Sequence, residues 1–332
     1  MKKVIFLLSI FMATSIALKA QTKLEPLDKD LSTVNYPYEV HFLEFISQNQ
    51  PLKMAYMDIQ PEKPNGRNIL LLHGKNFNGA YWERTIKFLT TEGFRVIVPD
   101  QIGFGKSTKP QSYQYSFNQL AENTKSILDK LQIKDAMVLG HSMGGMLATR
   151  FALMYPDFTK KLILENPIGL EDYKLFAPYQ SIDENYKAEL KNTVDTYRNY
   201  QLRFYYDNKW KAEYEPWLNL LAGWTLHADY PVIAWNAALT TDMIFTQPVV
   251  YEFKYIKTPT LLIIGTRDRT AIGKDRAKKE LQPMMGLYNE LGRKTQKLIS
   301  GSKLVELDGV GHLPHIEVFN RFITPLLDFV KN

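Results

Sequence analysis

The chain has 332 residues, 45% hydrophobic and 23% charged, and it contains no cysteine. These fractions are close to globular averages and exclude a fibrous or wholly disordered protein, while the lack of cysteine excludes disulfides, thiolate metal sites and a cysteine nucleophile. The net charge of +6 comes from 41 basic and 35 acidic residues that are interspersed along the chain. Because nucleic-acid binding needs a concentrated basic stripe, we expect no nucleic-acid partner.

The first twenty residues have the pattern of a targeting segment. Lys2 and Lys3 precede an apolar run of 15 residues, which is shorter than the roughly 20 needed for a membrane-spanning helix. Ala20 offers a small residue for cleavage, although Leu18 is larger than usual at its position, so an uncleaved anchor is the alternative. We predict that residues 1–20 are a signal peptide. The mature protein would then be periplasmic or secreted, with no stable membrane anchor.

Short apolar stretches alternate with amphipathic ones as far as residue 166. Strands are predicted at 39–46, 51–59, 68–72, 95–98, 136–139 and 161–164, and helices at 79–91, 116–131 and 145–155. Continuous apolar strands separated by helices are typical of a mostly parallel sheet with helices on both faces. We therefore assign residues 21–166 to the first part of an α/β core.

The alternation stops between residues 167 and 258. Nineteen of these 92 residues are aromatic, and helical spacing is evident over 184–200 and 211–221. Strands at 259–264 and 303–307 and a closing helix at 315–330 then resume the pattern, so residues 259–332 form the second part of the core. A helical insertion between two strands predicts a cap over the carboxyl edge of the sheet, where open α/β sheets bind ligands. The alternative is that its aromatic residues only pack the insertion itself.

The strongest local pattern is Gly140-His141-Ser142-Met143-Gly144, which lies directly after a predicted strand and before a predicted helix. A serine at this point sits on a strained turn with its hydroxyl exposed above the sheet. The flanking glycines are needed because larger side chains would collide with neighbouring backbone. The start of the helix directs free N–H groups at the same point, which suits a developing oxyanion. We predict that Ser142 is a nucleophile.

A serine hydroxyl needs a base, and the chain has six histidines. His312 follows the last predicted strand and therefore lies at the edge of the sheet that carries Ser142. The other five are expected in lesser roles: His315 as a solvated or capping residue, His73 supporting a turn, His141 pointing away from the nucleophile, His41 partly exposed on a strand, and His227 as a possible substrate contact in the cap.

The base in turn needs a carboxylate that orients its ring. Asp268 follows the strand at 259–264 and reaches the same edge of the sheet, so we predict that it is the acid. Glu165, at the end of an earlier strand, is the alternative. Asp308 also ends a strand, but it stands only four residues before His312, which makes a good orienting geometry harder.

The order Ser142, Asp268, His312, together with the Gly140–Gly144 turn and His73-Gly74 after an early strand, resembles the α/β-hydrolase superfamily over about residues 35–331. The segments Asp100-Gln101-Ile102-Gly103-Phe104-Gly105-Lys106-Ser107 and Gly311-His312-Leu313-Pro314, with Glu317, also resemble family motifs. The resemblance implies an α/β-hydrolase fold with a helical cap.

The same resemblance implies the oxyanion donors. In the family they are the backbone N–H groups after the nucleophile and after the His-Gly pair, here Met143 and Lys75. We expect the Lys75 ammonium itself to lie in solvent, and an orientation toward the site is the alternative.

The resemblance also limits the chemistry. Epoxide hydrolases and haloalkane dehalogenases of this superfamily carry aspartate where this chain has Ser142, so the serine implies an acyl-enzyme. Proline-iminopeptidase relatives carry a glycine-rich stretch at a position where this chain has His73-Gly74-Lys75-Asn76-Phe77. This difference weakens the aminopeptidase interpretation without removing it. We expect hydrolysis of a small to medium, partly apolar carboxylic ester or related acyl compound. A peptidase or amidase, a carbon–carbon bond hydrolase, an acyltransferase and a catalytically silent binding protein are the alternatives.

We expect no cofactor and no metal. Gly105-Lys106-Ser107 lacks the glycine that a phosphate-binding loop needs five residues earlier, where Asp100 stands. His312 and His315 have no acidic ligand pattern of the metallopeptidase type beside them. The expected partner is therefore a small-molecule acyl substrate alone.

Overall fold

The computed structural model describes residues 24–332, and the predicted signal peptide lies outside them. One eight-stranded sheet has the order β1-β2-β4-β3-β5-β6-β7-β8, and its neighbours are parallel from β4 through β8. The two pairs that involve β2 are antiparallel. The strands are β1 (Val40–Ser47), β2 (Gln50–Ile59), β3 (Asn68–Leu72), β4 (Arg95–Pro99), β5 (Ala136–His141), β6 (Thr159–Glu165), β7 (Thr260–Gly265) and β8 (Lys303–Leu307). The mostly parallel sheet predicted from the sequence is confirmed.

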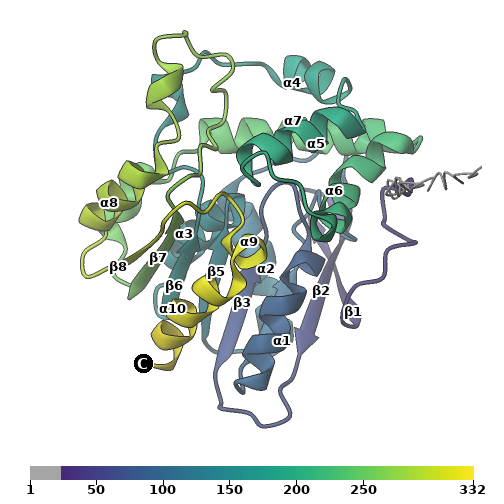
Figure 1. The fold of residues 1–332 in the computed structure, drawn as a ribbon. Coiled ribbons are helices and arrows are strands. Elements are labelled where there is room, and N and C mark those ends of the chain that lie inside the picture. Colours follow the sequence, from purple (N-terminus) through teal and green to yellow (C-terminus); the bar gives the residue numbers. More distant parts are fainter. Residues whose placement is uncertain (1–23) are drawn as a thin grey trace, which may run out of the picture.

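Helices cover both faces of this sheet (Figure 1). They are α1 (Glu83–Thr91), α2 (Phe117–Lys130), α3 (Met143–Met154), α8 (Tyr288–Leu298), α9 (Pro314–Glu317) and α10 (Phe319–Lys331). Every residue of β5 is buried, and successive side chains enter opposite cores: Val138 packs with α2 and α3, whereas Leu139 packs with α1 and α10. This division explains the continuous apolar strand, because both of its faces are covered.

A helical insertion separates β6 from β7 and lies over one end of the sheet (Figure 1). Its helices are α4 (Ile182–Glu189), α5 (Val194–Phe204), α6 (Glu215–Ala222) and α7 (Tyr230–Thr246). The helical spacing over 184–200 falls on two helices, α4 and α5, because the chain breaks and restarts with Thr193 as the N-cap of α5. The predicted closing helix is likewise two helices, α9 and α10. Within the part of the chain that the structure describes, no helix is long and apolar enough to span a membrane.

An N-terminal arm, residues 24–38, packs against this insertion, and the sequence did not predict it. Leu27 and Leu31 are buried against Trp224 and Ile233. The Leu27 N–H donates to the Gly223 carbonyl at 3.0 Å. The arm therefore adds a third connection between the core and the insertion, beyond the two chain crossings.

Candidate active site

Ser142 lies on a sharp turn between β5 and α3, as the sequence predicts. Its backbone has φ 56° and ψ −122°, a left-handed conformation that costs free energy in a residue other than glycine. A Cβ on Gly140 would overlap the Gly144 carbonyl, and a Cβ on Gly144 would overlap the Leu72 carbonyl of β3. The Ser142 N–H donates to the Glu165 carbonyl at 3.2 Å. Small flanking residues and neighbouring strands thus hold the strained turn.

His312 and Asp268 are brought together at the carboxyl ends of β8 and β7. Asp268 Oδ2 lies 2.6 Å from His312 Nδ1, and the two residues are 0% and 1% exposed. Burial alone would raise the pKa of Asp268, but His312 and hydrogen bonds from Thr270 and Asn166 outweigh it and hold this pKa below its usual range. The ionised carboxylate requires a proton on Nδ1, which leaves Nε2 of His312 free to accept one.

Asn166 supports the acid, and sequence reasoning missed it. Its Nδ2 donates to Asp268 Oδ2 at 2.8 Å, while its Oδ1 accepts from the Gly265 N–H at 2.8 Å. Its backbone is left-handed, with φ 35°, which asparagine tolerates better than most residues. The signal was its position directly after the strand that ends at Glu165. The amide fixes the rotamer of Asp268.

The alternative acid, Glu165, has a different partner. Its Oε1 accepts from the His315 backbone N–H at 2.9 Å and lies 2.8 Å from His315 Nδ1. Burial raises the pKa of Glu165 to about 7 and lowers that of His315 to about 3. The expectation of a solvated His315 is wrong. The residue is 3% exposed, and its ring stacks on that of Trp82 with 4.4 Å between the centroids. Asp308 also has a partner other than His312, since its carboxylate accepts from the Thr266 hydroxyl at 3.2 Å.

His141 links the turn to the base. Its Nε2 lies 2.7 Å from the His312 carbonyl, so this nitrogen carries the proton and Nδ1 accepts from the Tyr81 hydroxyl at 3.1 Å. The same hydroxyl accepts from the Gly74 N–H at 3.0 Å. Burial lowers the pKa of His141 to about 3, with His312 adding to the effect. This neutral chain of hydrogen bonds joins three of the loops that form the site.

The remaining histidines lie outside this arrangement. His73 Nε2 accepts from the Gln101 N–H at 3.0 Å, which fits the expected support of a turn. His41 is half-buried on β1, and His227 accepts from the Asp229 N–H at 3.2 Å in the insertion. The expected contact of His227 with a substrate stays a prediction.

Two backbone N–H groups are available beside the serine. Met143 is the first residue of α3, and Lys75 lies in the turn after β3. Among residues 24–332 neither N–H has an acceptor, as an oxyanion site requires. The Lys75 ammonium does not point to open solvent, contrary to expectation: it lies 3.3 Å from Glu189 Oε1 of α4, with 17% of the side chain exposed.

The insertion closes the site from above. The Tyr205 ring stacks on His312 with 5.1 Å between centroids, and its hydroxyl accepts from Asn76 Nδ2 at 3.0 Å. Ser142 is 7% exposed. The insertion therefore covers one face of His312.

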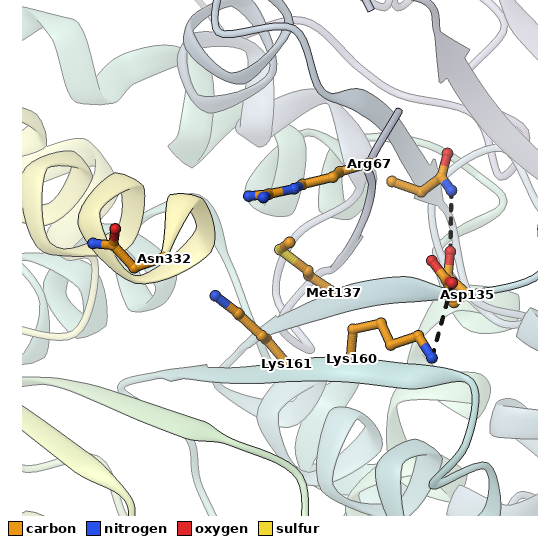
Figure 2. A pocket seen from close by; sticks show the side chains of 7 residues that line it. Arg67, Asp135, Met137, Lys160, Lys161 and Asn332 are labelled. Carbon is orange, nitrogen blue, oxygen red and sulfur yellow. Dashed lines mark hydrogen bonds and ion pairs between the residues drawn. The ribbon is translucent and has the colours of Figure 1, made fainter. Parts of the chain in front are cut away.

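A separate cavity of about 230 Å³ opens near the amino ends of β3, β5 and β6, the edge opposite Ser142 (Figure 2). Its lining is mostly basic or amide-bearing, with one acidic and one apolar residue: Arg67, Asn68, Asp135, Met137, Lys160, Lys161 and Asn332. Arg67 and Lys161 both donate to carbonyls at the end of α10. These contacts make the cations helix-capping groups. In the described chain, no group of three or more His, Asp or Glu side chains is placed to hold a metal ion.

Comparisons with known proteins assign the family of the chain. The family model described as the alpha/beta hydrolase fold matches residues 67–318. A solved structure of a probable hydrolytic enzyme from Pseudomonas aeruginosa PAO1 is 49% identical, covers 92% of this chain and 98% of its own, and superposes with a TM-score of 0.91. The chain therefore belongs to the α/β-hydrolase family, and it is a hydrolase of that fold.

More distant relatives differ in their stated activities. A haloalkane dehalogenase from Mycolicibacterium paratuberculosis is 32% identical over 160 residues, which are 45% of this chain and 52% of that protein. The chain thus spans about half the length of this relative. An esterase from Exiguobacterium antarcticum is 20% identical with a TM-score of 0.65, covering 85% of this chain and 96% of its own, and supports the fold alone.

Proposed function

We propose that this protein is an exported serine hydrolase that cleaves a small to medium, partly apolar carboxylic ester or related acyl compound. The observation that carries the proposal is the buried Asp268–His312 pair, with 2.6 Å between Oδ2 and Nδ1, at the sheet edge where Ser142 occupies its strained turn. A buried base with an ionised partner, at the same sheet edge as a serine on a strained turn, has the composition of an acyl-transfer site. Export rests on the sequence pattern of residues 1–20.

The proposed reaction has two halves. Ser142 Oγ attacks the ester carbonyl while His312 Nε2 takes the hydroxyl proton, and Asp268 stabilises the resulting imidazolium. The oxyanion is held by the N–H groups of Met143 and Lys75, each worth on the order of 3 kcal/mol of the barrier. His312 returns the proton to the leaving alcohol, which departs and leaves an acyl-enzyme. Water then attacks the acyl carbonyl with His312 as base, releasing the acid and restoring Ser142.

The surroundings favour an apolar acyl or alcohol group. Aromatic side chains lie beside the base: Tyr205 stacks on His312, and the Phe77 and Tyr205 ring centroids are 6.1 Å apart. Carbon–carbon bond hydrolysis is the second candidate, because a 2-hydroxy-6-oxononadienedioate/2-hydroxy-6-oxononatrienedioate hydrolase from Comamonas testosteroni is 34% identical over 146 residues, 51% of that protein. The serine at the turn suits both reactions, so a comparison of substrates is needed to distinguish them.

Labelling with a fluorophosphonate tests the proposal. We expect the purified protein to form a stoichiometric adduct that mass spectrometry maps to Ser142, and Ser142→Ala and His312→Ala to abolish it while circular dichroism stays unchanged. Turnover of ester substrates, compared with aminoacyl amides and vinylogous diketones, then assigns the bond cleaved. A folded protein that remains unlabelled by a smaller phosphonate as well would refute the serine mechanism. Amino-terminal sequencing of exported protein tests cleavage after Ala20.

A further inference from the structure

Tyr81 and His141 form a chain of hydrogen bonds that begins and ends on backbone groups of the site. The Gly74 N–H donates to the Tyr81 hydroxyl at 3.0 Å, and this hydroxyl lies 3.1 Å from His141 Nδ1. At the other end, His141 Nε2 lies 2.7 Å from the His312 carbonyl oxygen. A carbonyl can only accept, so Nε2 carries the proton and Nδ1 accepts from the tyrosine. We call this pair of side chains the Tyr81–His141 bridge.

The bridge joins two loops that the sheet does not pair with each other. Gly74-Lys75, the oxyanion loop, follows β3, whereas Gly311-His312, the base loop, follows β8. Strands β5, β6 and β7 lie between β3 and β8, so no strand ladder fixes one loop against the other. Tyr205 of the insertion also contacts both loops, but through the Asn76 side chain and the His312 ring. The bridge acts instead on the backbone of both loops.

The oxyanion loop is in contact with the serine turn as well. A Cβ added to Gly74 would lie 3.0 Å from Ser142 Cβ and 3.1 Å from His141 Nδ1. His141 is itself the residue before Ser142. A shift of Gly74 would therefore move the Lys75 N–H relative to the serine hydroxyl, and a misplacement of about 1 Å can cost about 100-fold in rate.

The bridge is closely packed and uncharged. Tyr81 is 2% exposed and His141 is 0% exposed. The Tyr81 ring stacks on Phe77 with 4.8 Å between centroids and meets Trp82 edge-on at 4.7 Å. Burial raises the pKa of the Tyr81 hydroxyl well above its usual range, and burial lowers the pKa of His141 to about 3. Both groups stay neutral near pH 7, so each hydrogen bond keeps its direction.

We infer that Tyr81 and His141 are positioning residues that hold the oxyanion loop and the base loop in register around Ser142. This inference rests on the proposed function, in which the serine is acylated. Each of the two side chains acts through the backbone of another residue. Loss of the bridge should therefore slow the acyl-transfer steps and leave substrate binding and the fold in place.

Tyr81→Phe tests the inference directly, because it keeps the ring and removes only the hydroxyl that joins Gly74 to His141. We expect kcat for p-nitrophenyl butanoate to fall about 10- to 100-fold while KM stays within about threefold. Tyr173→Phe is the matched control, since the buried Tyr173 hydroxyl also accepts from a glycine N–H, that of Gly169, at 2.9 Å. This control should keep kcat within about twofold. Thermal unfolding verifies that both variants fold.

Substitutions of His141 test the other half of the bridge. His141→Leu removes both hydrogen bonds and should lower kcat about as much as Tyr81→Phe does. His141→Gln keeps one acceptor and one donor and should recover most of that loss. Because the two residues act as one unit, the double variant Tyr81→Phe/His141→Leu should be about as slow as the slower single variant.

The outcomes separate the inference from the function beneath it. Native kcat in Tyr81→Phe would overturn the bridge's role, and so would an equal loss in Tyr173→Phe, a loss carried by KM alone, additive losses in the double variant, or His141→Gln as slow as His141→Leu. If His141→Leu does not fold, Tyr81→Phe and its control decide alone. A native protein without a Ser142 phosphonate adduct would instead overturn the proposed function, and the inference with it.

Discussion

Asp268 and Glu165 are both buried carboxylates at the ends of neighbouring strands, yet they have different surroundings. Asp268 receives hydrogen bonds from Asn166 and Thr270 in addition to its 2.6 Å contact with His312. Glu165 keeps one oxygen, Oε2, without a partner in the described chain, and its pKa is raised to about 7 by burial. A carboxylate that must stabilise a cation needs the first environment, since the second favours the neutral acid.

At the residue scale, we predict that conservative substitutions of these two carboxylates differ in their effect on kcat/KM. Asp268→Asn should lower kcat/KM by about three to four orders of magnitude, because the amide cannot fix the His312 tautomer or stabilise its cation. Glu165→Gln keeps an acceptor for the His315 N–H and should retain activity within about tenfold. Steady-state kinetics on one ester checks both. Full activity in Asp268→Asn together with a large loss in Glu165→Gln would move the acid to Glu165.

The turn at Ser142 shows how an element depends on close backbone approach. The start of α3 lies against the end of β3, and Gly144 is the residue in contact with the Leu72 and His73 carbonyls. A larger residue would push the helix away from the sheet and would move the Met143 N–H. The motif is therefore a packing requirement of β3, β5 and α3 together.

At the scale of the element, Gly144→Ala should destabilise the protein by at least about 3 kcal/mol and abolish phosphonate labelling, because its Cβ has no room beside rigid backbone. Gly301→Ala is the control: its φ is 71°, and nothing lies within 4 Å of the added Cβ. It should cost only roughly 1–2 kcal/mol, from the left-handed conformation alone. Urea unfolding measures both values, and equal losses would show that the turn tolerates a methyl group.

For the whole molecule, the buried titratable network predicts how stability depends on pH. Burial lowers the pKa of His141 and of His315 to about 3, from 6.5 in a free side chain, and raises that of Glu165 to about 7, from 4.5. Between pH 4.5 and 6.5 the unfolded chain therefore binds protons at both histidines, whereas the folded chain binds one at Glu165. These groups together bind about one proton more in the unfolded state, so the unfolding free energy rises with pH.

The expected slope from these groups is about 1.4 kcal/mol per pH unit. The Glu165→Gln variant lacks the proton that the folded chain binds at Glu165. The slope of unfolding free energy against pH should therefore increase by a similar amount. Urea unfolding at half-unit intervals from pH 5 to 6.5 gives the slopes. His41→Gln, a half-buried histidine on β1 outside the network, should behave as the native protein does. A slope in Glu165→Gln equal to or smaller than the native one would contradict the assigned protonation states.

The sequence by itself determined the class of fold and the edge of the sheet on which Ser142, Asp268 and His312 lie. Apolar strands and glycine spacing are local patterns, and parallel strands bring their carboxyl ends to one edge whatever the loops do. The shift from alternating elements to an aromatic helical insertion was equally local. The roles of the three residues in catalysis, and export, stay predictions for the experiments above.

Only the tertiary structure decided which side chains meet. Strand ends place Asp268, Glu165 and Asp308 at the same edge, and the choice among them depends on loop conformations such as the left-handed Asn166. The burial of His315 and the pairing of Lys75 with Glu189 both arise from segments far apart in the chain. Such contacts have no local sequence signal, because burial and hydrogen bonding are set by how the insertion and the loops pack over the sheet.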